Sequence, residues 1–203
     1  MSLSSEEEII RIKQENFIKN GIYHIYNRCV AGELLYRAVE DYWDFLKRFK
    51  KLTEKYSLSV FSYCLMPNHF HFLIKQNSAK PVNLLFNSLL SGYVQRYNNK
   101  YQRAGRLMSN KLQHKAIDSD NYLIYVIRYI HLNPTNAGLV DDLSHWEFSN
   151  YLEWVGIRKG KLFDPSVRES YYSSPDAYKL SYSDDRDDFN YSSIKEFLID
   201  FDE

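Results

Sequence analysis

The sequence has few cysteines, no long apolar run and no excess of charge of either sign. Its 203 residues include 2 cysteines, Cys29 and Cys64, which do not make a disulfide framework, and we expect both to be buried, reduced thiols. No apolar run approaches the roughly 20 residues that span a bilayer, so no membrane helix is expected. The first residues lack a basic flank followed by an apolar stretch, so we expect no secretory signal and a cytoplasmic protein.

The zero net charge conceals a division of the chain into three parts. Residues 17–163 carry 20 basic and 11 acidic side chains, whereas residues 164–203 carry 4 basic and 11 acidic ones. A basic body suits a polyanion such as nucleic acid, although a solvated, lysine-rich surface would give the same count. We expect a leader helix or flexible segment over 1–16, one domain over 17–163, and an acidic, partly ordered tail over 164–203.

Hydrophobic periodicity predicts alternating strands and helices within the basic body. The strands are expected over residues 21–28, 58–66, 69–75 and roughly 106–117. The helices are expected over 40–56, with Trp43 facing the core, over 81–101, and over 121–133, where Pro134 ends the helix. This order predicts an α+β fold with one sheet, in which the second and third strands pair antiparallel and the helices pack mainly on one face.

His69 and His71 lie two residues apart at the start of a predicted strand. Side chains two apart on a strand point to the same face, so the two imidazoles project together while Phe70 points to the opposite side. Imidazole is a common ligand of divalent transition metals, which makes the pair a candidate metal site. An ordinary polar strand face would show the same spacing, so the histidines alone leave both interpretations open.

Helical spacing singles out one candidate nucleophile among 18 tyrosines. Residues four apart share a helix face, and in the two later helices only Tyr129 has an amide partner at that spacing, Asn133. The Asn133 carboxamide oxygen suits a hard divalent cation. A tyrosine stripe packed on the sheet, with Asn133 merely ending the helix, remains the alternative.

A cluster of basic and aromatic residues occupies the end of the predicted helix 81–101 and the segment after it. Such a mixture suits phosphates and stacked bases, although a solvated helix end would look the same. The predicted DNA-binding residues are Arg96, Tyr97, Lys100, Arg103 and Arg106. Two other histidines, His24 on an apolar strand and His131 on a different helix face from Tyr129, are expected to be structural.

Four segments carry a resemblance to a known family. The segment YCLMPNHFHFLI (63–74) resembles the strand of single-tyrosine HUH transposases, in which a hydrophobic residue separates two histidines. The segment YVIRYIHLNPTNAGLV (125–140) resembles the tyrosine helix of the REP-associated tyrosine transposases. HWEFSNY (145–151) and YHIYNR (23–28) are similar to the closing segment and first strand of that branch. The similarity covers about residues 21–152 and does not include the acidic stretch after Phe163.

The resemblance implies a ferredoxin-like antiparallel core that acts on single-stranded or hairpin DNA. It implies Tyr129 as the nucleophile, which forms a 5′-phosphotyrosine and releases a 3′-hydroxyl, and His69, His71 and Asn133 as ligands of Mg²⁺ or Mn²⁺. A homodimer is left open, because relatives include dimers that exchange the tyrosine helix and self-contained monomers. Two rivals stay open as well: a domesticated protein that binds hairpin DNA without cutting it, and a nuclease that uses a metal-bound water.

Overall fold

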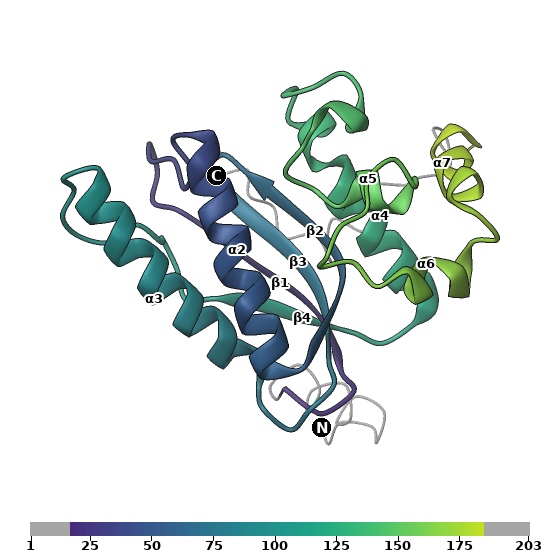
Figure 1. Cartoon of the computed structure of the whole chain (residues 1–203), viewed down its shortest axis with the longest axis horizontal. Coiled ribbons are helices and arrows are strands. Elements are labelled where there is room, and N and C mark those ends of the chain that lie inside the picture. Colours follow the sequence, from purple (N-terminus) through teal and green to yellow (C-terminus); the bar gives the residue numbers. More distant parts are fainter. Residues whose placement is uncertain (1–16, 185–203) are drawn as a thin grey trace, which may run out of the picture.

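The structure, a computed structural model, describes residues 17–184 (Figure 1). The expected leader helix over 1–16 and the tail residues 185–203 lie outside this range. Within it, no helix combines the length and the apolar character that crossing a membrane requires.

The core of the fold is a four-stranded antiparallel sheet with two connecting helices. Along the chain it runs β1 (Ile22–Arg28), α2 (Val39–Tyr56), β2 (Leu58–Met66), β3 (His69–Gln76), α3 (Val82–Lys100) and β4 (Gln113–Ile117). The strand order is β2-β3-β1-β4, so β1 pairs with both β3 and β4 although they are distant in sequence. This arrangement confirms the predicted α+β class and the antiparallel, ferredoxin-like sheet.

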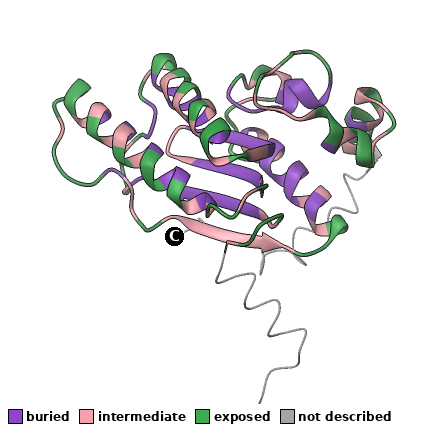
Figure 2. Ribbon diagram, turned by 60° about the horizontal axis from the view of Figure 1, so that its bottom comes forward, coloured by how far each residue is buried: buried purple, intermediate pink, exposed green. Residues whose placement is uncertain are grey.

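One face of the sheet packs against α2 and α3 in an apolar cluster. Alternation along β3 sends Phe70, Phe72 and Ile74 to this face, as the strand period of two requires. The cluster is rich in rings, and the centroids of Phe49 and Phe72 are 4.2 Å apart. Figure 2 shows the central strands buried, while all residues of the edge strand β4 are only half-buried.

The opposite face packs against the helices that follow the sheet. These are α4 (Asp120–Asn136), the 3-10 turn η1 (Leu143–His145), α5 (Tyr151–Trp154), α6 (Pro165–Tyr171) and α7 (Pro175–Asp184). A second buried cluster joins Leu73 of β3 to Val126, Ile130 and Trp154. The expectation that helices lie mainly on one face describes α2 and α3, whereas α4 to α7 group on the other side (Figure 1).

The tyrosine-bearing helix α4 does not end at Pro134, contrary to the sequence prediction. It continues to Asn136, because Pro134 lies in the last turn and removes only the one hydrogen bond that its own nitrogen would donate. The helix ends where Gly138 adopts a φ of 65°. The amides of Gly138 and Leu139 then donate to the carbonyls of Thr135 and Pro134, which is a Schellman motif.

Two smaller expectations are also corrected. Trp43 does not face the core, since it is 45% exposed, and Tyr42 and Phe45 of α2 are buried in its place. The fourth strand occupies only Gln113–Ile117, because the preceding residues form an irregular loop in which Asn110 and Ser109 bond to β1.

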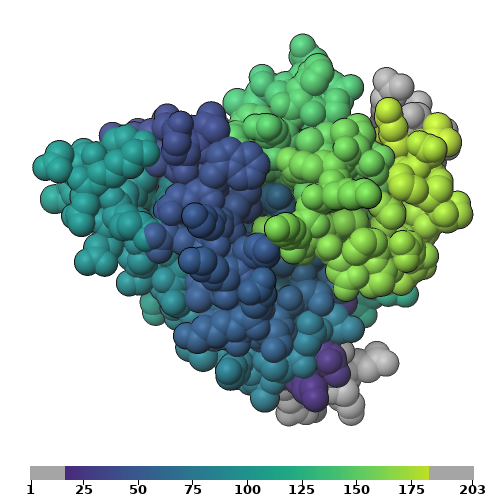
Figure 3. Space-filling model, in the orientation of Figure 1, coloured from purple at the N-terminus to yellow at the C-terminus, as the bar shows by residue number. Residues whose placement is uncertain are grey.

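The acidic stretch after Phe163 begins with structure that belongs to the domain. Residues 165–184 form α6 and α7, whose Val167 and Tyr178 are buried in the second cluster. Figure 3 shows this segment lying against the segments that precede it in the chain rather than standing apart. The ordered fold therefore extends past the boundary that charge alone would set at Phe163.

Candidate active site

The histidine pair lies at the start of β3, on the face that α4 covers. His71 is completely buried and His69 is partly buried, and their ring centroids are 5.0 Å apart. The turn at Pro67 and Asn68 reverses the chain between β2 and β3, so the strand begins with the first histidine. The two rings thus come together as the strand period predicts.

Each histidine is held through its Nδ1 atom. Nδ1 of His69 lies 2.7 Å from Oδ1 of Asn68, and because that oxygen only accepts, Nδ1 carries the proton. Nδ1 of His71 lies 2.9 Å from Nε2 of His24 on β1. Histidines that bind metals commonly have the second ring nitrogen held in this way, which orients the ring and selects Nε2 as the ligand atom.

Burial keeps both rings in the neutral form that a metal requires. Desolvation lowers the pKa of His69 to about 4, an effect that the hydrogen bond with Asn133 partly opposes and Arg28 reinforces. The pKa of His71 lies well below its ordinary value because of burial, with further lowering by His69 and His24. Both imidazoles are therefore uncharged at neutral pH.

Helix α4 brings Tyr129 and Asn133 to the histidines. The Tyr129 ring stands edge-on to His71, with centroids 5.5 Å apart and an interplanar angle of 83°. Its centroid lies 6.1 Å from that of the His24 ring, which it also meets edge-on. The side chain of Asn133 lies close enough to His69 to oppose the lowering of that ring's pKa, and its amide nitrogen donates to the Tyr129 carbonyl at 2.8 Å. The structure thus gathers four residues that strand and helix spacing predicted separately.

Two residues of β1 complete the site, and sequence reasoning did not place them there. His24, expected to be structural, hydrogen-bonds His71. The ring of Tyr26 stacks on that of His71, with centroids 6.0 Å apart and an interplanar angle of 28°. Tyr26 is the cross-strand partner of His71. The alternation of His24 and Tyr26 indicates a shared face, but only the pairing of β1 with β3 shows which residues that face meets.

The donor set of the site is two imidazoles and one amide oxygen. Across residues 17–184, no three His, Cys, Asp or Glu side chains are grouped so as to form a metal site of their own. The amide nitrogen of Asn133 donates to the Tyr129 carbonyl, so its amide oxygen is the atom with lone pairs to offer a cation. Neutral nitrogens and an amide oxygen form a chemically suitable set for a divalent cation of borderline hardness.

The predicted DNA-binding residues lie elsewhere, on α3 and the loop after it. This helix packs on the sheet face opposite to His71. Three of the cations form ion pairs with the body: Arg96 with Asp44 at 3.0 Å, Lys100 with Asp41 at 2.6 Å and Arg103 with Glu33 at 2.9 Å. The hydroxyl of Tyr97 donates to the carbonyl of Leu34, and Arg106 donates to that of Ser109. DNA contact by these residues stays a prediction.

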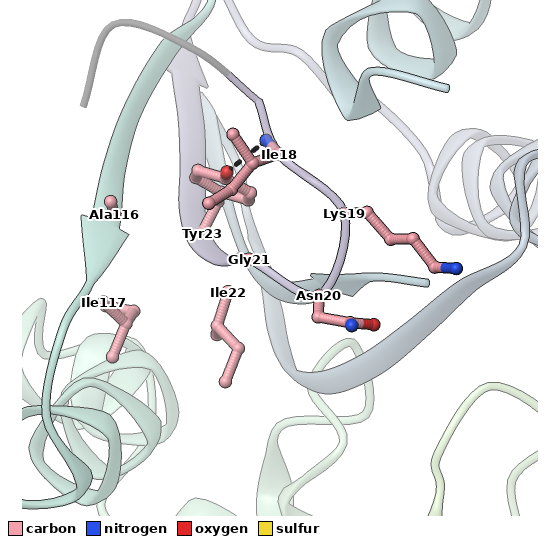
Figure 4. Close-up of a pocket in the computed structure, with 8 residues that line it drawn as sticks. All are labelled: Ile18, Lys19, Asn20, Gly21, Ile22, Tyr23, Ala116 and Ile117. Atoms are coloured by element: carbon pink, nitrogen blue, oxygen red, sulfur yellow. Dashed lines mark hydrogen bonds between the residues drawn. The ribbon is translucent and has the colours of Figure 1, made fainter. Parts of the chain in front are cut away.

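A pocket at the other end of the sheet is separate from the histidines. It has a volume of about 290 Å³ and lies beside the first residues of β1 and the last of β4, where Ile22 is paired with Ile117 (Figure 4). His69 pairs with Arg28, at the opposite end of β1. The pocket therefore does not extend the candidate site.

Comparisons with known proteins identify relatives of this chain. The sequence profile of the family described as "Transposase IS200 like" matches residues 18–133, which include every side chain of the candidate site. A protein from Haemophilus influenzae, named as a candidate REP-associated tyrosine transposase, is 24% identical over 150 residues, covering 68% of this chain and 84% of that protein.

A solved structure shares the fold. It is a REP-associated tyrosine transposase bound to a REP hairpin, and it aligns with a TM-score of 0.56 at 15% identity. The alignment covers 73% of this chain and 94% of the solved one. The profile match covers more than half of the chain and includes both histidines and Tyr129. The resemblance to the REP-associated tyrosine branch is therefore confirmed, and the chain belongs to the family of IS200-like transposases.

Proposed function

We propose that the protein is a single-stranded DNA endonuclease and strand transferase whose nucleophile is the phenolic oxygen of Tyr129. The observation that carries the proposal is the edge-on contact of the Tyr129 ring with His71, at 5.5 Å between centroids. The site is assembled from β1, β3 and α4, so it depends on the fold rather than on one local motif. Membership of a transposase family supports DNA as the substrate.

The proposed reaction is a transesterification. The phenolic oxygen of Tyr129 bonds to a backbone phosphorus, and the bond from that phosphorus to the 3′ oxygen breaks. The phenol gives up its proton, and the departing 3′ oxygen takes up a proton and becomes a hydroxyl. Because the 5′-phosphotyrosine keeps a phosphoester bond, attack by another 3′-hydroxyl reverses the step and joins strands without an external energy source.

His69, His71 and Asn133 are proposed to hold Mg²⁺ or Mn²⁺, and two imidazoles favour Mn²⁺ in affinity. A phenol with a pKa near 10 is a poor nucleophile at neutral pH. A bound divalent cation would polarise the scissile phosphate and stabilise the charge that builds on it. The hydrogen bonds at both Nδ1 atoms and the neutral state of both rings support this role.

Hairpin DNA is the proposed form of substrate. The solved structure that shares this fold was bound to a REP hairpin, and residues 17–163 carry 9 more basic than acidic side chains. Such an excess attracts the phosphate backbone without regard to sequence, so salt should weaken binding. Arg96, Tyr97, Lys100, Arg103 and Arg106 remain the proposed contacts on the α3 side.

A labelled hairpin oligonucleotide with a single-stranded flank tests the proposal. The protein is incubated with this DNA and Mn²⁺, and the products are separated on a denaturing gel. We expect a protein-linked DNA band that disappears in Tyr129→Phe and persists in Tyr125→Phe, the matched change one turn earlier on α4. Chelation of the metal should abolish the band in the unaltered protein.

Other results would favour the two rivals. Cleavage that survives Tyr129→Phe would support a nuclease that activates a metal-bound water. Retardation of the hairpin on a native gel, with no cleavage in Mn²⁺ or Mg²⁺, would support a binding protein without enzymatic activity. Either result would overturn the assignment of Tyr129.

A further inference from the structure

A buried hydrogen-bond network surrounds His131 on the side of α4 that faces away from the candidate site. Nδ1 of His131 lies 2.6 Å from the hydroxyl of Tyr178 on α7. Its Nε2 lies 2.9 Å from Oδ1 of Asn150 and 3.0 Å from Oγ of Ser62 on β2. All four residues have an exposed fraction of 0%. Three separate parts of the chain therefore meet on one imidazole.

The directions of these hydrogen bonds follow from the chemistry of Asn150. Its amide nitrogen donates to the Phe61 carbonyl at 3.1 Å, so its Oδ1 is an acceptor. That oxygen also accepts from the backbone amide of Tyr63 at 2.7 Å. Nε2 of His131 therefore carries the proton, and Nδ1 accepts from the Tyr178 hydroxyl. The network selects one tautomer and one orientation of the His131 ring.

A β-bulge brings Ser62 into this network. The register of β2 against β3 shifts between Val60 and Ser62, which breaks the regular alternation of that strand. Phe61 packs in the cluster around α4, and Ser62, the next residue, also reaches α4 through His131. Bulges near functional sites commonly redirect a side chain in this manner. Two residues later, Cys64 is the cross-strand partner of His71.

Helix α7 holds α4 at a second point, next to the tyrosine. Arg128 donates to the Ser181 carbonyl at 2.9 Å, and its guanidinium lies 5.1 Å from the centre of the Tyr182 ring. The family match ends at residue 133, so α7 lies beyond it. The contacts of Arg128 and His131 with α7 therefore lie on either side of Tyr129 in the sequence.

We propose that α7 is a brace for the tyrosine helix, and that His131 and Tyr178 are positioning residues for Tyr129. Residues two apart on a helix are separated by about 200° of rotation, so Tyr129 and His131 lie on opposite sides of α4. Fixing His131 to β2 and α7 therefore fixes the rotation of α4 and the place of the Tyr129 ring beside His71.

This inference rests on the proposed role of Tyr129, and paired tyrosine variants test it. Tyr178→Phe removes the hydroxyl that reaches His131. Tyr93→Phe is the matched control, since its buried hydroxyl donates to the Leu35 carbonyl at 2.6 Å on the opposite side of the sheet. Ser62→Ala is a smaller change at the same network, in case Tyr178→Phe fails to fold.

The measurement is the single-turnover rate of covalent adduct formation, together with the dissociation constant for the hairpin. We expect Tyr178→Phe to slow adduct formation about tenfold, because small misplacements of a reacting group are costly, and to leave hairpin affinity unchanged. Tyr93→Phe should lower the thermal midpoint to a similar extent without slowing the reaction. Equal rates in the two variants would overturn the inference.

Hydrogen exchange gives a readout that does not depend on catalysis. Amides of α4 around Val126–Ile130 should exchange faster in Tyr178→Phe and in Ser62→Ala than in Tyr93→Phe. Unchanged protection of α4 would contradict the brace. If Tyr129→Phe still forms the adduct, the proposed nucleophile is wrong. If Tyr129→Phe loses the adduct but Tyr178→Phe forms it at the normal rate, only the positioning role of His131 and Tyr178 is wrong.

Discussion

The two faces of the sheet are built from alternating residues of the same strands, yet they differ in chemistry. Phe70, Phe72 and Ile74 of β3 enter a cluster of rings and aliphatic chains under α2 and α3. His71, between two of them, faces the other way, where His24, Ser62 and other polar side chains are equally buried under α4. One face supplies apolar burial, and the other holds oriented polar groups.

The difference between the two faces shows how the fold accommodates buried polar side chains. Burying a polar group is unfavourable unless it is hydrogen-bonded, and on the α4 face His24, Asn68 and the His131 network supply such bonds. The α2 and α3 face has less need of such bonds and is packed by shape. We therefore expect changes on the α4 face to affect the reaction more than stability, and changes on the other face to do the reverse.

The largest expected effect is that of Tyr129→Phe on the reaction. Removal of a nucleophile should lower the rate of adduct formation by about 10⁴-fold or more. The free energy of unfolding should change by less than about 1 kcal/mol, because only one oxygen atom is lost. Gel analysis and urea denaturation measure the two quantities. A large loss of stability would mean that the phenol is mainly a structural group.

The second-largest effect is expected on the α2 and α3 face, where a substitution should lower stability and leave the reaction nearly unchanged. Phe86 of α3 is completely buried and stacks on Phe70 at 5.7 Å. Phe86→Ala should lower the free energy of unfolding by about 3–5 kcal/mol, which denaturant unfolding would show. At a temperature where the variant stays folded, adduct formation should be within about twofold of normal. A selective loss of activity would remove the distinction between the faces.

A smaller effect is expected from Asn68, which holds a proposed ligand but does not itself bind the cation. Asn68→Ala removes the acceptor 2.7 Å from Nδ1 of His69. Loss of such a partner typically weakens metal affinity about 10–100-fold. Titration of adduct formation with Mn²⁺ should show a shifted midpoint and a nearly unchanged maximum rate. Asn77→Ala, at the exposed end of the same sheet, is the control and should leave the midpoint in place.

The smallest expected effect is the pH-dependent contribution of Asp41, on the α2 and α3 side, to the stability of the protein. Burial raises the pKa of Asp41, but hydrogen bonds from Lys100, Tyr101 and the backbone of Ala38 and Arg37 outweigh it, so the pKa is lowered overall. A lowered pKa means that ionised Asp41 stabilises the folded protein at pH values above its ordinary pKa near 4. This stabilisation is lost as the pH falls through the pKa of the folded state. Because Lys100 is 47% exposed, solvent screening keeps the gain small.

Denaturant unfolding at several pH values measures this contribution. The stability of the unaltered protein should exceed that of Asp41→Asn at neutral pH, and the difference should shrink as the pH falls below about 4. Adduct formation at neutral pH should be the same in both proteins. A difference that grows in acid would show that the pKa of Asp41 is raised.

Much of the site was predictable because its spacing is local. A strand period of two joins His69 to His71, and a helical turn joins Tyr129 to Asn133. The contact between the two pairs depends on α4 packing across β3, which no local pattern shows. His24 was missed for the same reason, since its bond to His71 requires the pairing of strands that lie 47 residues apart.

The errors at particular elements have physical causes. Pro134 suggested a helix end because it lacks a donor, but the left-handed Gly138 is what ends α4. Trp43 was expected inside because it lies at helical spacing from Leu46, whereas Phe45 and Tyr42 fill that face. The docking of α7 on α4 could not be predicted from its acidic surroundings, because net charge gives no sign that Tyr178 is buried against His131.

The His131 network also sets an order of events during protein synthesis. Ser62, His131 and Asn150 leave the ribosome well before Tyr178, the last of the four residues to be made. A growing chain therefore contains both histidines and Tyr129 for some time before the hydroxyl that completes the network exists. Since domains generally fold as units while they are synthesised, the proposed brace implies that the tyrosine helix reaches its final setting only at this late stage. Under our proposal, the ability to cut DNA is acquired after nearly all of the domain has been translated.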